Sequence, residues 1–391
     1  MVFIAVSGIL TFVLLGIVQS LYGPLLPGLA RAFALEATTV GFVFTAHGLG
    51  ALLGVLLPSL LSGRALAGYW LGIASALILV GAAAVAMATS WPAVLLAVFV
   101  LAIGLGIHVV RLNALFVSAF WERGMTMSLL LNAGFSVGAI LGPVVVGLTG
   151  ELSRELFGVV ALLALALLPV SVLTDKKARA LAGASTDRAP GPASGAESRL
   201  GSPLLLAAFV ALMCLTTGVE NSISGWMATV ALAQGYSFSS AANLTALFFG
   251  GIFTGRLVAA GLAHRMESAF LVIAALSCIA VLLAISIVMR SVPIGFVLSG
   301  FAIAPLFSAT LVWLSVALPT ARHAHTLVVA GALLGSATLP ALVGRAVGSF
   351  GPAAAAPAIL CIAVAALAVA VCARLARERR PTREVQTSRS V

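Results

Sequence analysis

The sequence predicts an all-α polytopic membrane protein with twelve transmembrane helices arranged as two six-helix pseudo-repeats. Of its 391 residues, 62% are hydrophobic and only 8% are charged, whereas soluble domains carry about 25% charged residues. Apolar runs of the roughly 20 residues that one crossing needs recur along the whole chain. These runs are too long and too continuous for the strands of a barrel, so helices are the only spanning structure that fits them.

Breaks in hydropathy divide the chain into the twelve expected spans. The first span has no charged segment before it, so we expect a retained helix and not a signal peptide. The fourth and seventh runs exceed one crossing, and their ends should tilt or protrude. The spans cover residues 2–29, 38–61, 68–89, 91–120, 125–150, 156–173, 204–233, 239–263, 268–289, 292–318, 326–347 and 352–375.

One long polar segment separates the sixth span from the seventh. Its richness in Ala, Gly, Ser and Pro is typical of a flexible linker. We therefore expect an N-terminal six-helix bundle at 1–174, a linker at 175–203, a C-terminal six-helix bundle at 204–375 and a basic tail at 376–391. Parallel repeats of this kind place their binding site between the two halves, near the membrane midplane.

The distribution of Lys and Arg predicts the orientation. Of the 21 basic residues, fifteen flank the spans on the side of the linker, four lie on the other side, and Arg111 and Arg256 lie inside spans. The positive-inside rule then places the linker and both termini in the cytoplasm, in a plasma (inner) membrane. Because the net charge of +10 is spread over loops and the tail, we expect contact with the lipid bilayer and no nucleic-acid partner.

Motifs for catalysis and metal binding are absent from the sequence. The four cysteines lie within apolar runs without a CxxC or Cys/His cluster, which indicates neither a disulfide framework nor a zinc site. There is no phosphate loop, no HExxH and no GxSxG that could serve a triad. We expect no enzyme, no metal and no cofactor.

Glu220 is the acidic residue that lies inside an apolar run. A charge at this depth costs on the order of 3 kcal/mol on insertion scales, and such residues usually face an aqueous cavity. Our functional hypothesis is that burial favours the neutral carboxyl, which can then bind and release a proton as the cavity opens alternately. The structural alternative is a protonated carboxyl that bonds a neighbouring helix. Polar and glycine neighbours favour the functional role: Thr216, Thr217, Gly218, Asn221, Ser222, Ser224 and Gly225.

Arg111 and His108 share a helix face in the fourth span. Arg111 could pair with Glu220 or hold an anionic or hydroxyl-rich ligand, and the alternative is that it snorkels to the cytoplasmic interface. His47 and His108 could relay protons or could be neutral, hydrogen-bonded core residues.

Further polar and aromatic side chains at membrane depth are weaker candidates for the cavity. Trp226 could stack on a sugar face or an aromatic ligand. Single amides such as Gln19 and Asn113 could bind solute, although many such residues only join helices.

The fifth span contains Gly138-Ala-Ile-Leu-Gly142-Pro143-Val-Val-Val-Gly147. This run resembles the GxxxGPxxG signature of the major facilitator superfamily, with the last glycine one residue later. Together with the six-plus-six layout, the resemblance covers essentially the whole chain. It implies the major facilitator fold and secondary transport by alternating access. Gly142 and Pro143 match the motif and are expected gating residues, as is Arg256.

Three further segments resemble the fucose-permease-like, sugar-type branch of that superfamily, and this resemblance implies a sugar or polyol as solute. They contain Asn113 with Asn132, Gly218 to Trp226, and Phe249 to Arg256. The chain also departs from the superfamily pattern. Residues 54–64 lack the acid of the GxxxDRxGRR loop, which puts the usual latch of the first half in doubt. The first span lacks the carboxylate of several proton symporters, which leaves Glu220 alone.

We therefore predict a monomeric, proton-coupled symporter of a small solute. The proton site is Glu220, and the expected solute contacts are Arg111, Asn221, Trp226, Asn113, Gln19, His47 and His108. Three alternatives stay open: an efflux transporter of lipophilic or organic-anion compounds, a uniporter in which Glu220 only accepts hydrogen bonds, and a sensor or lipid scramblase on the same fold.

Overall fold

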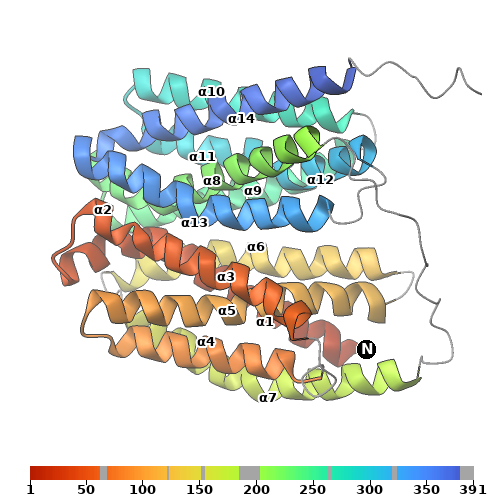
Figure 1. The fold of residues 1–391 in the computed structure, drawn as a ribbon. Helices are drawn as coiled ribbons and strands as arrows, with labels where there is room; N and C mark the ends of the chain where they lie inside the picture. Colours follow the sequence, from red (N-terminus) through yellow and green to blue (C-terminus); the bar gives the residue numbers. More distant parts are fainter. Residues whose placement is uncertain are drawn as a thin grey trace, which may run out of the picture.

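The computed structural model describes residues 1–61, 68–120, 123–150, 155–184, 203–262, 266–318 and 324–378. Within this part of the chain, twelve helical segments are long and apolar enough to cross a membrane. Figure 1 shows them side by side in two bundles, one from each half of the sequence. The predicted fold class is confirmed, and the span boundaries differ from the prediction by at most four residues except at the end of the sixth span.

The N-terminal half packs through small residues. A Cβ on Gly138 of α6 would overlap the backbone of Val13 in α1, and one on Gly16 would overlap Phe135, so these two helices touch along their backbones. The helices of this half are α1 (Val2–Ala32), α2 (Ala37–Val40), α3 (Phe42–Leu60), α4 (Trp70–Met87), α5 (Trp91–Ala119), α6 (Gly124–Thr149) and α7 (Glu155–Ala184).

The C-terminal half contains one broken crossing. Helices α11 and α12 together form a single span, and the chain breaks between them at Pro305, which cannot donate a backbone hydrogen bond. The elements of this half are α8 (Pro203–Ala233), α9 (Phe238–Leu262), α10 (Ser268–Val288), α11 (Val292–Ile303), α12 (Leu306–Ala317), α13 (Ala324–Phe350), η3 (Pro352–Ala354) and α14 (Ala355–Glu378).

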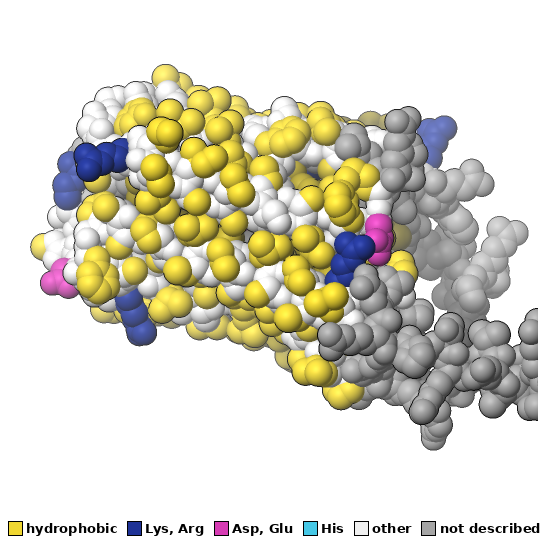
Figure 2. Space-filling model, turned by 90° about the horizontal axis from the view of Figure 1, so that it is seen from above, with side chains coloured by type: hydrophobic (Ala, Val, Ile, Leu, Met, Phe, Trp, Pro, Cys, Tyr) yellow, Lys and Arg dark blue, Asp and Glu magenta, His cyan; other side chains and the backbone are white. Residues whose placement is uncertain are grey.

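The outer surface is apolar along the helices. Figure 2 shows hydrophobic side chains over the length of one face of the molecule, with Lys, Arg, Asp and Glu near its ends. Many Leu, Val and Phe side chains on the long helices are exposed, which suits contact with lipid. Helix α1 begins and α14 ends at the same end of the molecule; we call this end the terminal face and the other end the opposite face.

Helix α7 continues past the expected start of the linker at residue 175 and ends at Ala184. The reason is that its polar residues bind the rest of the N-terminal half. The carboxylate Oδ2 of Asp175 accepts hydrogen bonds from the backbone N–H groups of Leu71 and Gly72, both at 3.0 Å. These amides belong to the first turn of α4, where a helix has unpaired donors and a positive end.

Neighbouring residues of α7 add to this attachment. The hydroxyls of Thr174 and Ser7 lie 3.0 Å apart, and the Arg179 guanidinium lies 4.5 Å from the centre of the Tyr69 ring. The polar run that suggested a linker is therefore partly a docked helix end. Residues 185–202, which hold most of the expected linker, and 379–391, which hold most of the expected tail, lie outside the described residues.

We expect the Asp175→Ala variant to be less stable than the wild type by about 1–2 kcal/mol, because two first-turn amides of α4 lose their acceptor. The measurement is the thermal unfolding midpoint of the purified protein in detergent. Lys176→Ala is the matched control, since Lys176 is the exposed next residue on the same helix. Equal midpoints for both variants would contradict the proposed role of Asp175.

Candidate functional site

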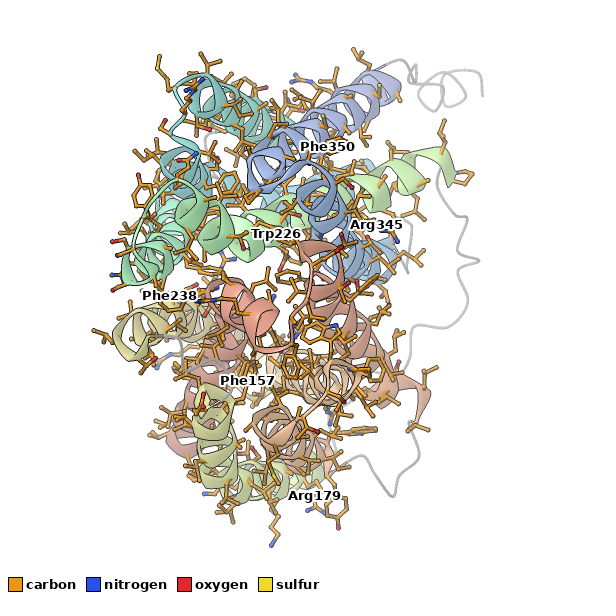
Figure 3. The ribbon with its side chains drawn as sticks, turned by 90° about the vertical axis from the view of Figure 1, so that its left-hand side faces the viewer. Phe157, Arg179, Trp226, Phe238, Arg345 and Phe350 are labelled. Carbon is orange, nitrogen blue, oxygen red and sulfur yellow. The ribbon has the colours of Figure 1, made fainter. Side chains whose placement is uncertain are left out.

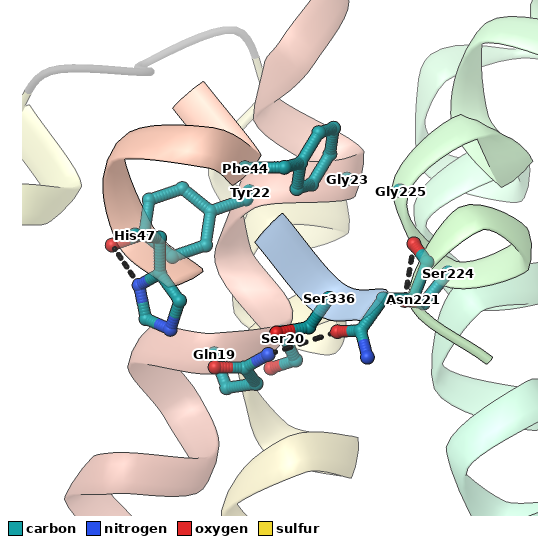
Figure 4. A pocket seen from close by; sticks show the side chains of 10 residues that line it. All are labelled: Gln19, Ser20, Tyr22, Gly23, Phe44, His47, Asn221, Ser224, Gly225 and Ser336. Atoms are coloured by element: carbon teal, nitrogen blue, oxygen red, sulfur yellow. Dashed lines mark hydrogen bonds between the residues drawn. The ribbon is translucent and has the colours of Figure 1, made fainter. Parts of the chain in front are cut away.

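A polar pocket lies between the two halves, close to the middle of α1 and α8. The space that admits the centre of a water-sized sphere is about 10 Å³, room for about one water molecule, so the pocket is nearly closed in this arrangement. Figure 4 shows that its walls come from α1, α3, α8 and α13. The lining residues are Gln19, Ser20, Tyr22, Gly23, Phe44, His47, Asn221, Ser224, Gly225 and Ser336.

Two amides join the halves inside this pocket. Gln19 Nε2 donates to Asn221 Oδ1 at 3.1 Å, and Asn221 Nδ2 donates to the carbonyl of Thr217, one turn earlier in α8, at 2.9 Å. The bond between Gln19 and Asn221 therefore has one partner in each half. Its donor and acceptor groups are those that a polar solute could replace.

Tyr22 and His47 form a second polar pair in the pocket wall. The Tyr22 hydroxyl and His47 Nδ1 lie 3.2 Å apart, and the rings meet edge to face with centroids 4.9 Å apart. Both side chains are buried. His47 thus lines the pocket and is also hydrogen-bonded within the protein.

Glu220 precedes Asn221 in α8 and keeps part of its side chain accessible. The charge that acts on its carboxyl is that of Arg256 in α9. Arg256 Nη1 also donates to Ser136 Oγ of α6 at 3.2 Å. Arg256 therefore stands between the acid of the C-terminal half and a hydroxyl of the N-terminal half.

Arg111 is not placed with Glu220. It lies within charge–charge range of Asp175, as does Arg179, so it belongs to the cluster that holds the end of α7. The sequence alone does not distinguish pairing with Glu220 from pairing with Asp175, because either acid is compatible with a basic residue at that position of α5.

His108 and Asn113 also lie away from the pocket. His108 is 1% exposed, and its Nε2 lies 3.0 Å from the Ser75 hydroxyl, which in turn lies 2.7 Å from that of Ser171. Asn113 Oδ1 accepts hydrogen bonds from Ser128 Oγ at 3.2 Å and Asn132 Nδ2 at 3.3 Å, between α5 and α6. Both residues thus contact their own half.

Trp226 packs against α13 and does not line the pocket. It is completely buried, and its indole N–H donates to the Pro340 carbonyl at 2.9 Å. Figure 3 shows Trp226 where the C-terminal half meets the N-terminal half. A Cβ on Gly41 or Gly344 would touch its ring, so Trp226 fills the junction instead of offering a free face to a solute.

The halves remain in close contact from the pocket toward the opposite face. A Cβ on Gly23 of α1 would overlap the backbone carbonyl of Ser224 in α8. Thr45 Oγ1 of α3 donates to the Ala337 carbonyl of α13 at 2.7 Å. Of the predicted gating residues, Gly142 packs against Ser20, which lines the pocket, and Pro143 lies buried beside it in α6.

Sequence reasoning missed five lining residues, because serines, glycines and aromatic residues are common throughout apolar helices: Ser20, Tyr22, Gly23, Phe44 and Ser336. The sequence contained one signal for two of these residues. Pro24 follows Ser20 by four residues, and Pro340 follows Ser336 by four residues, so each proline removes the N–H that would bond to the serine carbonyl.

The Major Facilitator Superfamily model matches residues 8–327. The chain belongs to the Major Facilitator Superfamily. This confirms the predicted superfamily and makes membrane transport the class of its activity. No curated protein sequence matches the chain.

Solved transporters of this superfamily have the same fold. The nucleoside transporter NupG is 14% identical, with a TM-score of 0.71 over 97% of this chain and 99% of that one. A D-xylose-proton symporter is 15% identical, with a TM-score of 0.72 over 94% and 96%. The peptide transporter POT in complex with sulfate is 15% identical, with a TM-score of 0.74 over 96% and 94%. At such low sequence identity the similarity shows a shared fold only.

Proposed function

We propose that this protein is a secondary active transporter that couples the movement of a small, uncharged, hydroxyl-bearing solute to a proton bound at Glu220. The observation that carries the proposal is the pocket between the halves, where Gln19 and Asn221 meet one residue away from that acid. Solute and proton would then act on the same interface, which is what coupling requires.

The pocket lining supports an uncharged solute. It consists of amides, hydroxyls, glycines, Phe44 and the His47–Tyr22 pair, and it includes neither Arg111 nor any Lys, Asp or Glu. Arg111 was the reason to consider organic anions, and it lies with Asp175. A sugar or polyol also agrees with the resemblance to the fucose-permease-like branch and with the D-xylose-proton symporter among the structural neighbours.

Arg256 offers a physical route for coupling. While Glu220 is protonated, the Arg256 guanidinium can remain on Ser136 across the interface. When Glu220 is ionised, its carboxylate attracts the same guanidinium, because charge-assisted pairs are stronger than bonds to a neutral hydroxyl. Proton release then weakens a contact between the halves, and proton binding restores it.

The contacts beyond the pocket support a direction of access. The halves meet closely toward the opposite face, through Gly23, Ser224, Thr45 and Ala337. If the terminal face is cytoplasmic, as the distribution of basic residues predicts, the side on which these contacts close the pocket is the outer side. Proton-driven uptake then ends with solute release into the cytoplasm.

The test uses proteoliposomes that contain a pH dye. Sugars, polyols, nucleosides and organic acids are added one at a time, and the lumenal pH is followed together with solute uptake. We expect proton entry with at least one sugar or polyol and none with organic acids. Uptake without proton movement would identify a uniporter, and proton movement with organic anions alone would favour the efflux alternative.

A further inference from the structure

We infer that the pocket binds hydroxyl groups of its solute through backbone carbonyls that three prolines have released from the helical hydrogen-bond pattern. These are the carbonyl oxygens of Ser20, Gly23 and Ser336. The inference rests on the proposed function and refines it. It assigns the solute a set of at least two hydrogen-bond donors.

The release follows from helix geometry. In an α-helix the carbonyl of residue i accepts from the N–H of residue i+4. Proline has no N–H, and its ring pushes against that same carbonyl. Pro24 and Pro27 lie inside α1, and Pro340 lies inside α13. The carbonyls four residues earlier are those of Ser20, Gly23 and Ser336.

All three of these residues line the pocket. The other prolines inside the helices whose interior prolines the structure identifies are Pro58, Pro143 and Pro169. The residues four positions before them, Gly54, Ala139 and Leu165, do not line it. Released carbonyls therefore gather at the pocket between the halves and are not spread evenly among the proline-containing helices.

Carbonyls next to these prolines already accept hydrogen bonds from outside their own helix. Beside Ser336, the Ala337 carbonyl accepts from Thr45 Oγ1 at 2.7 Å, and the Pro340 carbonyl accepts from the Trp226 indole at 2.9 Å. The backbone around Pro340 is thus open to external donors.

The Ser336 carbonyl directly precedes that of Ala337, which accepts a hydrogen bond from Thr45. The Ser336 hydroxyl donates to the Leu333 carbonyl at 2.8 Å. Among the side chains that the structure describes, none has an assigned hydrogen bond to the carbonyl of Ser20, Gly23 or Ser336. A carbonyl that has lost its usual helical donor gains from a water or a ligand hydroxyl that can donate to it.

This arrangement selects the class of solute. Carbonyl oxygens accept hydrogen bonds and repel anions, so carboxylates gain nothing from them. A lipophilic compound would displace water and leave the acceptors unpaired, which is costly. A polyol can donate to the carbonyls and exchange bonds with the Gln19 and Asn221 amides at the same time.

The test restores the missing donors. In Pro340→Ala and Pro24→Ala the new N–H can pair with the carbonyl of Ser336 or Ser20, and alanine favours the helix, so folding should not suffer. Dissociation constants are measured by isothermal titration calorimetry on the full chain, with pentoses, hexoses and their monodeoxy analogues. Pro169→Ala in α7 is the matched control, because Leu165 lies outside the pocket.

We expect each pocket variant to bind the parent sugar roughly three- to tenfold more weakly, as the loss of one hydrogen bond implies. One monodeoxy analogue, which lacks the matching hydroxyl, should bind wild type and variant equally, so that the double-mutant cycle is non-additive. The control should match the wild type. Equal weakening of all analogues would mean that the helix has merely straightened, and the inference would fall.

These experiments distinguish a failure of the carbonyl inference from a failure of the proposed function. If organic acids alone move protons while no sugar or polyol binds, the proposed function and the inference both fall. If sugars drive proton movement but the two proline variants bind them like the wild type, the proposed function stands and the inference falls alone. If no solute of any class moves protons, the proposed function fails in its own assay.

Discussion

Replacing Glu220 by Gln should reduce solute-driven proton movement to the level of empty liposomes. The amide keeps the size of the carboxyl but cannot exchange a proton, and Glu220 is the acid placed beside the Gln19–Asn221 contact. Solute binding should change by no more than about threefold, because an isosteric change beside a pocket costs about 0.5 kcal/mol. Proteoliposomes with a pH dye report the proton, and solute exchange across the same membrane reports the remaining transport.

The matched control is Glu267→Gln. Glu267 is 54% exposed and pairs with Arg374 at 3.4 Å near the terminal face, so its neutralisation should leave coupling intact. Full proton movement in the Glu220 variant would show that another group carries the proton. Glu220 would then be a structural or solute-binding carboxyl, as in the uniporter alternative.

Replacing Gly23 by Ala should stop transport and shift the protein away from the arrangement described above. The new methyl group would overlap the Ser224 backbone carbonyl where α1 meets α8. Backbone cannot yield as a flexible side chain does, so closure toward the opposite face becomes unfavourable while each half can still fold. The readout is labelling of Ser336→Cys by a membrane-impermeant maleimide added at the opposite face, in a background without the four native cysteines.

Gly138→Ala separates this effect from simple misfolding. Gly138 meets Val13 in the same half, so its substitution should lower the yield and the unfolding midpoint without exposing the pocket. For Gly23→Ala we expect the labelling rate to rise by roughly tenfold, which corresponds to a shift of about 1.4 kcal/mol between the two arrangements. Normal transport with unchanged labelling would show that the contact at Gly23 does not control closure.

Much of the fold could be predicted because hydropathy is a local property. Each crossing needs an apolar run, and the breaks between runs mark the loops. The predicted end of the sixth span, at residue 173, was wrong for the same reason, because α7 continues to Ala184. Asp175 is polar and therefore reads as linker, but its partners, Leu71 and Gly72, lie about a hundred residues earlier in the chain. Only tertiary structure shows that the charge is satisfied within the protein.

The site could be predicted only in part. Gln19, Asn221 and His47 stand out because an amide or imidazole at membrane depth needs a partner, and the structure places all three in the pocket. His108 has the same local signature, and Trp226 was an aromatic candidate, but both are buried against other helices. Depth along a helix can be read from sequence; the direction in which a side chain points around the helix depends on which neighbours pack there, and that is not local.

The attachment of α7 has a consequence for the order of events during synthesis. The two backbone amides that bond Asp175 precede it, in α4, and α7 ends at Ala184. Helix α14 begins only at Ala355. At about 5–20 residues per second on the ribosome, the 170 residues between these positions take about 9–34 s. The N-terminal half can thus close its own polar contacts well before the last helix of the C-terminal half leaves the ribosome.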